Sequence, residues 1–254
     1  MKKRRGYRLI KIILLLTAVV CLIPVGQACY LSVQHKEQQK ELKTSLEKVK
    51  AQEQGAAEQR LDKFQELYSQ NSDLTGWLAI KGTVIDYPVL QCEDDSYYLS
   101  HSFYKEKDKY GCLFVKNQAD VHTPGTNFII YGHNMKDGSM FGTLDSYKSK
   151  EFYKGHSEIS FDTLYEERDY QILAVFETEL YGKDEFPYYQ FYQAETEKEF
   201  QDFYRKIKEL SFYDTGVAAE YGDTFLTLST CSDSGGNNRF VVVAKRLTEE
   251  KYIY

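Results

Sequence analysis

The stretch Leu226-Thr-Leu-Ser-Thr-Cys231, followed by Asn237-Asn-Arg-Phe-Val-Val-Val-Ala244, decides the architecture of this chain. Both runs are rich in apolar and β-branched residues, which favours strands. Glycines at 235 and 236 mark a turn between them. Cys231 therefore ends one predicted strand and Arg239 begins the next. A thiol close to a guanidinium is the pairing expected of a cysteine nucleophile with a group that stabilises developing negative charge.

A second strand end lies about a hundred residues upstream, in Asn127-Phe-Ile-Ile-Tyr-Gly-His-Asn-Met135. His133 at this end can take a proton from a thiol and later give one to a leaving amine. Arg239 cannot act as a base, because its guanidinium does not lose its proton. Each residue alone is weak evidence. Together they could form a thiol acyl-transfer site if the fold brings the three strand ends together.

The N-terminal segment predicts export. Residues 1–8 are a basic tail, and residues 9–31 form a largely apolar stretch about as long as the ~20 residues that a bilayer requires. The positive-inside rule then places the tail in the cytoplasm and the rest of the chain outside the cell. The alternative is a cleaved secretory signal, which exports the remainder as well.

Composition narrows the function classes. A net charge of −6 argues against nucleic-acid binding. The 22 Tyr and 15 Phe residues are enough to form a large hydrophobic core. Cys92 and Cys112 are expected to be small buried residues, with a disulfide between them as the alternative. No cysteine pair has zinc-ligand spacing, and no metal or cofactor is expected.

The remaining pattern predicts a stalk and one β-rich domain. Residues 32–60 are charged and indicate a helical stalk or linker, and residues 61–254 form the domain. Between residues 76 and 90, short strands are expected that are broken at Gly82 and at Pro88. Further strands are expected at 112–116, 126–131, 157–161, 169–178, 223–230 and 239–246. Many short strands favour a closed or nearly closed β-barrel. Residues 194–210 predict an amphipathic helix in the long connection before the cysteine strand, where it would wall a substrate groove.

These motifs resemble those of a known family. Thr-Leu-Ser-Thr-Cys (227–231) with Arg239 resembles the signature of the sortases. Tyr-Gly-His-Asn-Met (131–135) and Met-Phe-Gly-Thr-Leu (140–144) are similar to the histidine segment of class B sortases in particular. Gly-Trp-Leu-Ala-Ile (76–80), Ile-Asp-Tyr-Pro-Val-Leu-Gln (85–91) and the helix before the cysteine strand also fit that class.

The resemblance implies a mainly β fold, a closed eight-stranded sortase-type β-barrel with N-terminal helices. It also implies a membrane-anchored cysteine transpeptidase of Gram-positive bacteria that cleaves a C-terminal sorting motif after its threonine. Cys231 would form the thioester, His133 would act as general acid and base, and Arg239 would stabilise the oxyanion or position the substrate. Ser229 and Thr230 would line the groove, and Leu99 would contact the proline of the motif.

The implied partners are secreted proteins with a sorting motif and an amine from a peptidoglycan precursor or a pilin lysine. A surface cysteine protease or amidase that uses water, and an inactive binding module, remain alternatives. The sequence does not name the sorting motif, the acceptor or the role, which could be general anchoring, anchoring of haem-uptake proteins or pilus assembly. It also leaves open whether Asp233 orients His133 or only forms a turn.

Overall fold

The computed structural model describes residues 26–47, 62–182, 185–231 and 237–247. The chain divides into two compact units, Met1–Leu42 and Lys43–Tyr254. Residues 26–47 are helical. Most of the predicted anchor (9–31) and the later part of the predicted stalk (32–60) lie outside the described residues. Among the helices in the described ranges, none has both the length and the apolar character needed to cross a bilayer.

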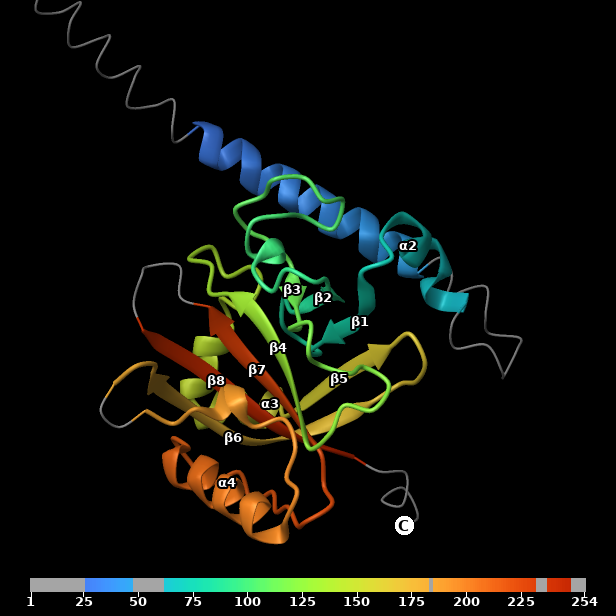
Figure 1. Cartoon of the computed structure of the whole chain (residues 1–254). Coiled ribbons are helices and arrows are strands. Elements are labelled where there is room, and N and C mark those ends of the chain that lie inside the picture. The colour runs from blue at the N-terminus through green and yellow to red at the C-terminus, as the bar shows by residue number, and fades with distance from the viewer. Residues whose placement is uncertain (1–25, 48–61, 183–184, 232–236, 248–254) are drawn as a thin grey trace, which may run out of the picture. The chain divides into compact units, whose positions relative to one another are not determined.

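The described residues of the second unit form a closed eight-stranded barrel, which confirms the predicted fold (Figure 1). Around the barrel the strands follow the order β1-β2-β3-β4-β7-β8-β6-β5. The β2–β3 and β4–β7 pairs are parallel, and the other pairs are antiparallel. The strands are β1 (Leu74–Ala79), β2 (Asp86–Leu90), β3 (Leu113–Phe114), β4 (Asn127–His133), β5 (Glu158–Thr163), β6 (Asp169–Glu179), β7 (Phe225–Cys231) and β8 (Asn238–Arg246).

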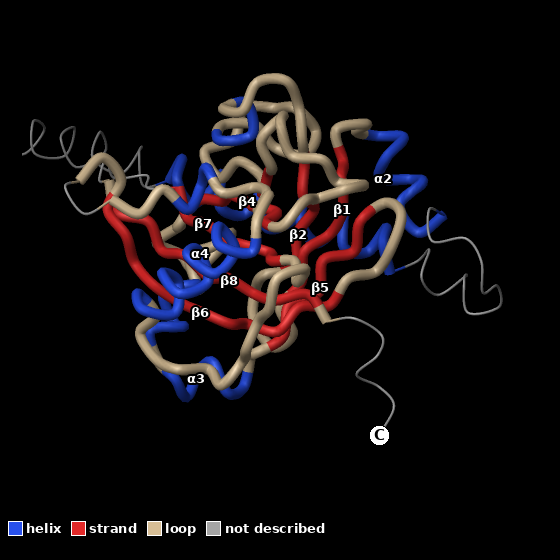
Figure 2. The backbone as a smooth tube through the Cα atoms, turned by 60° about the horizontal axis from the view of Figure 1, so that its bottom comes forward, coloured by secondary structure: helices blue, strands red, loops and turns tan. Residues whose placement is uncertain are grey.

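Helical elements precede β1 and lie in several of the connections between strands (Figure 2). They are η1 (Asp62–Phe64), α2 (Gln65–Gln70), η2 (Tyr97–Leu99), η3 (Leu144–Lys148), α3 (Lys150–Gly155), η4 (Tyr188–Gln190) and α4 (Glu197–Leu210). The helix α4 is the one predicted at 194–210. It begins after Thr196, whose side chain accepts a hydrogen bond from the backbone N–H of Glu199, as expected of an N-cap residue.

Two apolar layers hold the domain together. The barrel interior is filled by large side chains such as Phe128, Phe161 and Leu228, all at most 2 % exposed. A second layer lies outside the barrel, where Phe200 and Phe203 of α4 pack with Phe225 on β7. The amphipathic face predicted for this helix is therefore the face that it buries. Alternating strand residues supply the two layers, because successive side chains of a strand point to opposite faces.

The predicted break at Pro88 is wrong, because Pro88 lies inside β2, opposite Trp77 of β1. Proline is tolerated in a strand where its missing N–H is not required by a ladder. The parallel partner β3 pairs only with Val89 and Leu90, so Pro88 lies just before the part of β2 that has neighbours on both sides.

Barrel closure depends on a close approach at Gly76. A Cβ atom at this position would lie 2.4 Å from the carbonyl oxygen of Asp162 and 2.9 Å from the ring of Phe161, both on β5. We expect Gly76→Ala to lower the free energy of unfolding by about 1–3 kcal/mol, since forced overpacking costs that much. Urea unfolding measures the change. Gly155→Ala is the control, because a Cβ there meets nothing within 4 Å. Equal losses in the two variants would contradict this account of closure.

Candidate active site

The parallel pair β4–β7 brings His133 and Cys231 together. Seven residues of β4 pair in unbroken register with seven of β7, from Asn127 opposite Phe225 to His133 opposite Cys231. Both strands end at this last pair. Neighbouring strands lie about 4.8 Å apart, so two residues separated by about a hundred positions in sequence become lateral neighbours.

Arg239 lies on the other side of Cys231. The antiparallel register of β7 and β8 runs to Ser229 opposite Val241. One position further, the hydroxyl oxygen of Thr230 accepts a hydrogen bond from the backbone N–H of Phe240 at 2.9 Å. If the register of β7 and β8 is extended by one residue beyond Thr230 and Phe240, Cys231 lies opposite Arg239. His133, Cys231 and Arg239 thus occupy adjacent positions across three strands, and we call this set the strand-end row.

A backbone carbonyl orients the histidine ring. The Nε2 atom of His133 donates a hydrogen bond to the carbonyl oxygen of Leu99, with 2.7 Å between the two atoms. A carbonyl oxygen can only accept, so Nε2 carries a proton and Nδ1 is the basic atom of the neutral ring. His133 is partly exposed as a residue, whereas its Nδ1 atom is buried. The bond can persist in both protonation states, because Nε2 is a donor in each.

The Leu99 carbonyl is itself held in place. Leu99 ends the turn η2, and the neighbouring carbonyl of Tyr98 accepts a hydrogen bond from the N–H of Cys112 at 2.9 Å. Gly111, with a φ of +59°, lies against this turn. A Cβ atom there would lie 2.2 Å from the Tyr98 oxygen and 3.0 Å from the Leu99 oxygen. Glycine is therefore needed both for the left-handed backbone and for the close approach.

The residues just before Cys231 are buried and differ in their partners. The Ser229 side chain is fully buried, and its hydroxyl is hydrogen-bonded to the hydroxyl of the buried Tyr188 at 2.6 Å. Ser229 thus joins β7 to the connection that contains η4 and presents no surface to a groove in this structure. Thr230 is 3 % exposed but contributes to the wall of a cleft. Arg239 is partly exposed, and its Nη1 donates to the carbonyl of Asn238 at 3.0 Å.

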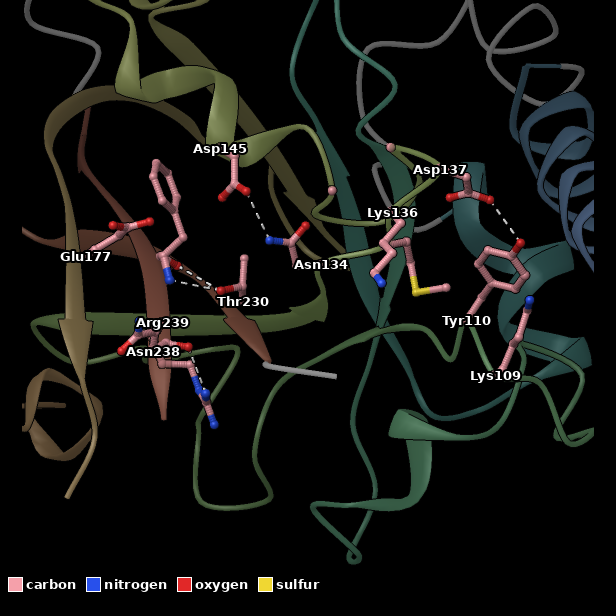
Figure 3. Close-up of a pocket in the computed structure, with 14 residues that line it drawn as sticks. Lys109, Tyr110, Asn134, Lys136, Asp137, Asp145, Glu177, Thr230, Asn238 and Arg239 are labelled. Carbon is pink, nitrogen blue, oxygen red and sulfur yellow. Dashed lines mark hydrogen bonds between the residues drawn. The ribbon is translucent and has the colours of Figure 1, made fainter. Parts of the chain in front are cut away.

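An open cleft of about 770 Å³ lies beside the strand ends (Figure 3). Residues adjacent in the chain to His133 and Cys231 contribute to it, together with the start of β8, the end of β6 and the loop after β4. Its lining is Lys109, Tyr110, Asn134, Met135, Lys136, Asp137, Gly138, Gly142, Asp145, Glu177, Thr230, Asn238, Arg239 and Phe240. Neither His133 nor Leu99 lines it, so their contact lies outside this cleft.

The other thiols and histidines have different surroundings. Cys92 and Cys112 are free rather than bridged. Burial raises the pKa of the Cys112 thiol and also that of Cys92, which disfavours the nucleophilic thiolate. His101 and His156 donate to the carbonyls of Tyr97 and Phe152. Within the described ranges no three His, Cys, Asp or Glu side chains gather as a metal site. Asp233 lies outside the described residues.

Comparisons with known proteins agree with this geometry. The family model of the sortase domain matches residues 78–247. Sortase B of Listeria monocytogenes is 37 % identical over 194 residues, which cover 74 % of this chain and 75 % of the relative. Sortase B of Staphylococcus aureus is 28 % identical over 247 residues, covering 96 % and 98 %. The solved Staphylococcus aureus sortase B–substrate complex superposes with a TM-score of 0.79 at 28 % identity, covering 86 % of this chain and 98 % of that one.

A closed barrel with cysteine, histidine and arginine positions at adjacent strand ends defines a cysteine acyl-transfer enzyme of the sortase type. The chain belongs to the sortase family and is a class B sortase transpeptidase.

Sequence reasoning missed three features of the site. It singled out Leu99 for its side chain and did not anticipate that the Leu99 carbonyl oxygen contacts His133. It did not pair Ser229 with Tyr188, because nothing distinguishes this tyrosine among 22. It also did not anticipate that Asp145 and Glu177 would line a cleft beside the strand ends. Each contact joins segments that are distant in sequence and is made by a residue type common throughout the chain.

The role of Gly111 can be tested directly on the histidine ring. We expect Gly111→Ala to displace the Leu99 carbonyl and to cost about 1–2 kcal/mol from the left-handed backbone alone. His133 should then lose its single tautomer, which ¹⁵N NMR of the imidazole nitrogens records. Gly125→Ala is the matched control, because Gly125 has a φ of +64° and its Cβ would lie 2.8 Å from the carbonyl oxygen of Tyr192. An unchanged Nε2–H signal in Gly111→Ala, or an equal change in the control, would contradict the assignment.

Proposed function

We propose that this enzyme is tethered to the cell membrane and cleaves secreted proteins after the threonine of a C-terminal sorting motif. It then joins the new carboxyl end to an amine. The proposal is supported by the strand-end row, in which His133 pairs with Cys231 and the β7–β8 register, extended beyond Ser229 and Val241, sets Arg239 opposite Cys231. In support, a substrate complex is known for the sortase B of Staphylococcus aureus, which this chain resembles along almost its whole length.

The first half-reaction forms the thioester. The Cys231 thiolate attacks the threonine carbonyl carbon, and the negative charge that develops on the carbonyl oxygen is stabilised by Arg239. Collapse of the tetrahedral intermediate breaks the peptide bond. The leaving amine takes a proton from the Nδ1 atom of His133, while the Leu99 carbonyl holds Nε2.

The second half-reaction releases the product. The lone pair of an acceptor amine attacks the thioester carbonyl, and the amine transfers a proton to Nδ1 of the now neutral His133. The carbon–sulfur bond then breaks and Cys231 leaves as a thiolate. The enzyme thus returns to the state in which it began, with a protonated histidine and an ionised thiol.

The substrate-binding expectations become more specific in this proposal. Leu99 is assigned two tasks: its carbonyl orients His133, and its partly exposed side chain contacts the motif beside the ring. Thr230 forms the wall next to the nucleophile. The buried Ser229 does not contact the substrate in this proposal. Its hydrogen bond to Tyr188 positions the end of β7 relative to the connection that contains η4.

The cellular setting rests on the N-terminal sequence. Residues 9–31 would anchor the chain with residues 1–8 in the cytoplasm, and the barrel would act outside the cell. The partners would be exported proteins with a sorting motif, together with the amine of a peptidoglycan precursor or a pilin lysine. General anchoring, anchoring of haem-uptake proteins and pilus assembly are all compatible with this chemistry.

The nucleophile can be tested by intact-protein mass spectrometry. The enzyme is incubated with labelled peptides that share a proline and a following threonine. We expect a thioester adduct on the parental enzyme and none on Cys231→Ala, since an alanine side chain has no sulfur to acylate. Cys92→Ala, at a cysteine that is free in the structure, should form the adduct at the parental rate. A thioester on Cys231→Ala, or peptide cleavage by it at the parental rate, would refute the assignment.

The choice of acceptor separates a transpeptidase from a protease that uses water. Addition of triglycine should convert cleaved peptide into the triglycine adduct, because the amine competes with water for the thioester. If hydrolysis is the only outcome at every triglycine concentration, the proposed transfer to an amine is wrong, although cleavage by Cys231 would stand.

A further inference from the structure

The loop that follows His133 contains a residue in an unfavourable backbone conformation. Met140 has a φ of +52°, in the left-handed region that residues other than glycine rarely adopt. Its side chain is 1 % exposed and belongs to the apolar core of the barrel. A strained backbone of this kind persists only where surrounding contacts fix it, and such residues are common at functional sites. The backbone of Met140 must therefore be held by its neighbours.

This loop returns to the residue at which it begins. Asn134 and Met140 form an antiparallel bridge, and the N–H of Phe141 donates to the carbonyl oxygen of His133 at 2.9 Å. The Phe141 side chain is fully buried, and a Cβ atom at Gly132 would lie 2.8 Å from its ring. A shift of Met140 would therefore be passed to the backbone of Gly132 and His133.

The end of β4 has little support from a neighbouring strand on the side away from β7. The strand β3 is two residues long and pairs with β4 at one position, Phe114 opposite Tyr131. Gly132 and His133 pair with β7 on their other side, whereas no residue of β3, which the structure describes in full, pairs with either of them. The loop after His133 therefore supports this end of β4 where a longer β3 would otherwise do so.

The Tyr87 hydroxyl holds Met140 from a more distant strand. Its oxygen accepts a hydrogen bond from the backbone N–H of Met140, with 3.2 Å between the two atoms. Tyr87 lies on β2, which is separated from β4 by β3 in the barrel order, and it is 7 % exposed. A buried backbone N–H needs an acceptor, and the Tyr87 oxygen provides it at the strained residue.

We propose that Tyr87 is a positioning residue for His133. By accepting the Met140 N–H, its hydroxyl keeps the loop after β4 in place and thereby fixes the backbone from which the imidazole projects. The Leu99 carbonyl orients the ring itself, and the two contacts together set His133 relative to Cys231. The inference rests on the proposed function, in which His133 transfers protons, and Tyr87 does not contact the substrate.

Tyr87→Phe tests this role, because it removes one oxygen atom and keeps the aromatic ring in the core. The buried Met140 N–H would lose its acceptor, and the strained backbone could relax. We expect the rate of thioester formation at saturating donor peptide to fall about tenfold, on the scale of one buried hydrogen bond lost. The peptide concentration that gives half of this rate should not change, since the substrate contacts are kept. Intact-protein mass spectrometry of the full-length enzyme at timed intervals measures both quantities.

The imidazole of His133 gives a second readout that does not depend on the reaction. ¹⁵N NMR of the full-length enzyme should show the Nε2–H signal of His133 shifted or broadened in Tyr87→Phe. The reason is that the ring would no longer keep one position against the Leu99 carbonyl. Urea unfolding of each variant shows that the protein is folded under the conditions of both measurements.

Tyr147→Phe is the matched control. Tyr147 is fully buried in the same core, and its hydroxyl donates to the carbonyl oxygen of His156 at 2.6 Å. The variant thus loses a comparable hydrogen bond to a backbone group outside the loop after β4. It should keep the parental rate of thioester formation and the parental His133 signal.

Three results would overturn the inference and leave the proposed function intact. They are an unchanged His133 signal in Tyr87→Phe, equal changes in Tyr87→Phe and Tyr147→Phe, and a loss confined to the affinity for the donor peptide. If the parental enzyme forms no thioester, the proposed function is wrong, and the NMR comparison alone decides whether Tyr87 positions His133.

Discussion

The parallel pairing of β4 with β7 is the constraint on which the site depends. Parallel neighbours cannot be joined by a tight turn, so the chain travels through β5, β6 and α4 before β7 returns beside β4. Because side chains alternate along a strand, a slip of one residue would move every contact to the other face. The seven-residue register is set by apolar residues of both strands that fill the barrel interior, so the core that folds the protein also fixes the position of His133 relative to Cys231.

Two polar contacts next to the row are made by backbone and neutral groups. A carbonyl orients the imidazole, and a hydroxyl pair joins the cysteine strand to the η4 connection. Each such hydrogen bond contributes about 1 kcal/mol net to the free energy of unfolding. Their main effect is therefore to position the atoms of the site. Charged residues such as Lys136, Asp145 and Glu177 line the adjacent cleft.

The sequence predicted the barrel, the helix before the cysteine strand and the three strand ends, because period-two alternation and an amphipathic stripe are local signals. The break expected at Pro88 shows the limit of that reasoning. A proline is excluded from a strand only where the ladder requires its N–H, and the ladder is a property of the assembled sheet. The Leu99 carbonyl was equally inaccessible to pattern analysis, since every residue has a carbonyl and only the folded chain shows which one the histidine contacts.

The register of β4 and β7 is the central claim, and an engineered disulfide tests it most directly. In His133→Cys the new thiol would lie opposite Cys231, at a strand separation of about 4.8 Å that a disulfide can span. In the control variant Tyr131→Cys, the new thiol would lie opposite Ser229, two positions away from the residue that pairs with Cys231. Mild oxidation followed by peptide mapping should give a 133–231 bridge in the first variant and no 131–231 bridge in the second. A bridge from position 131, or none from position 133, would contradict the account.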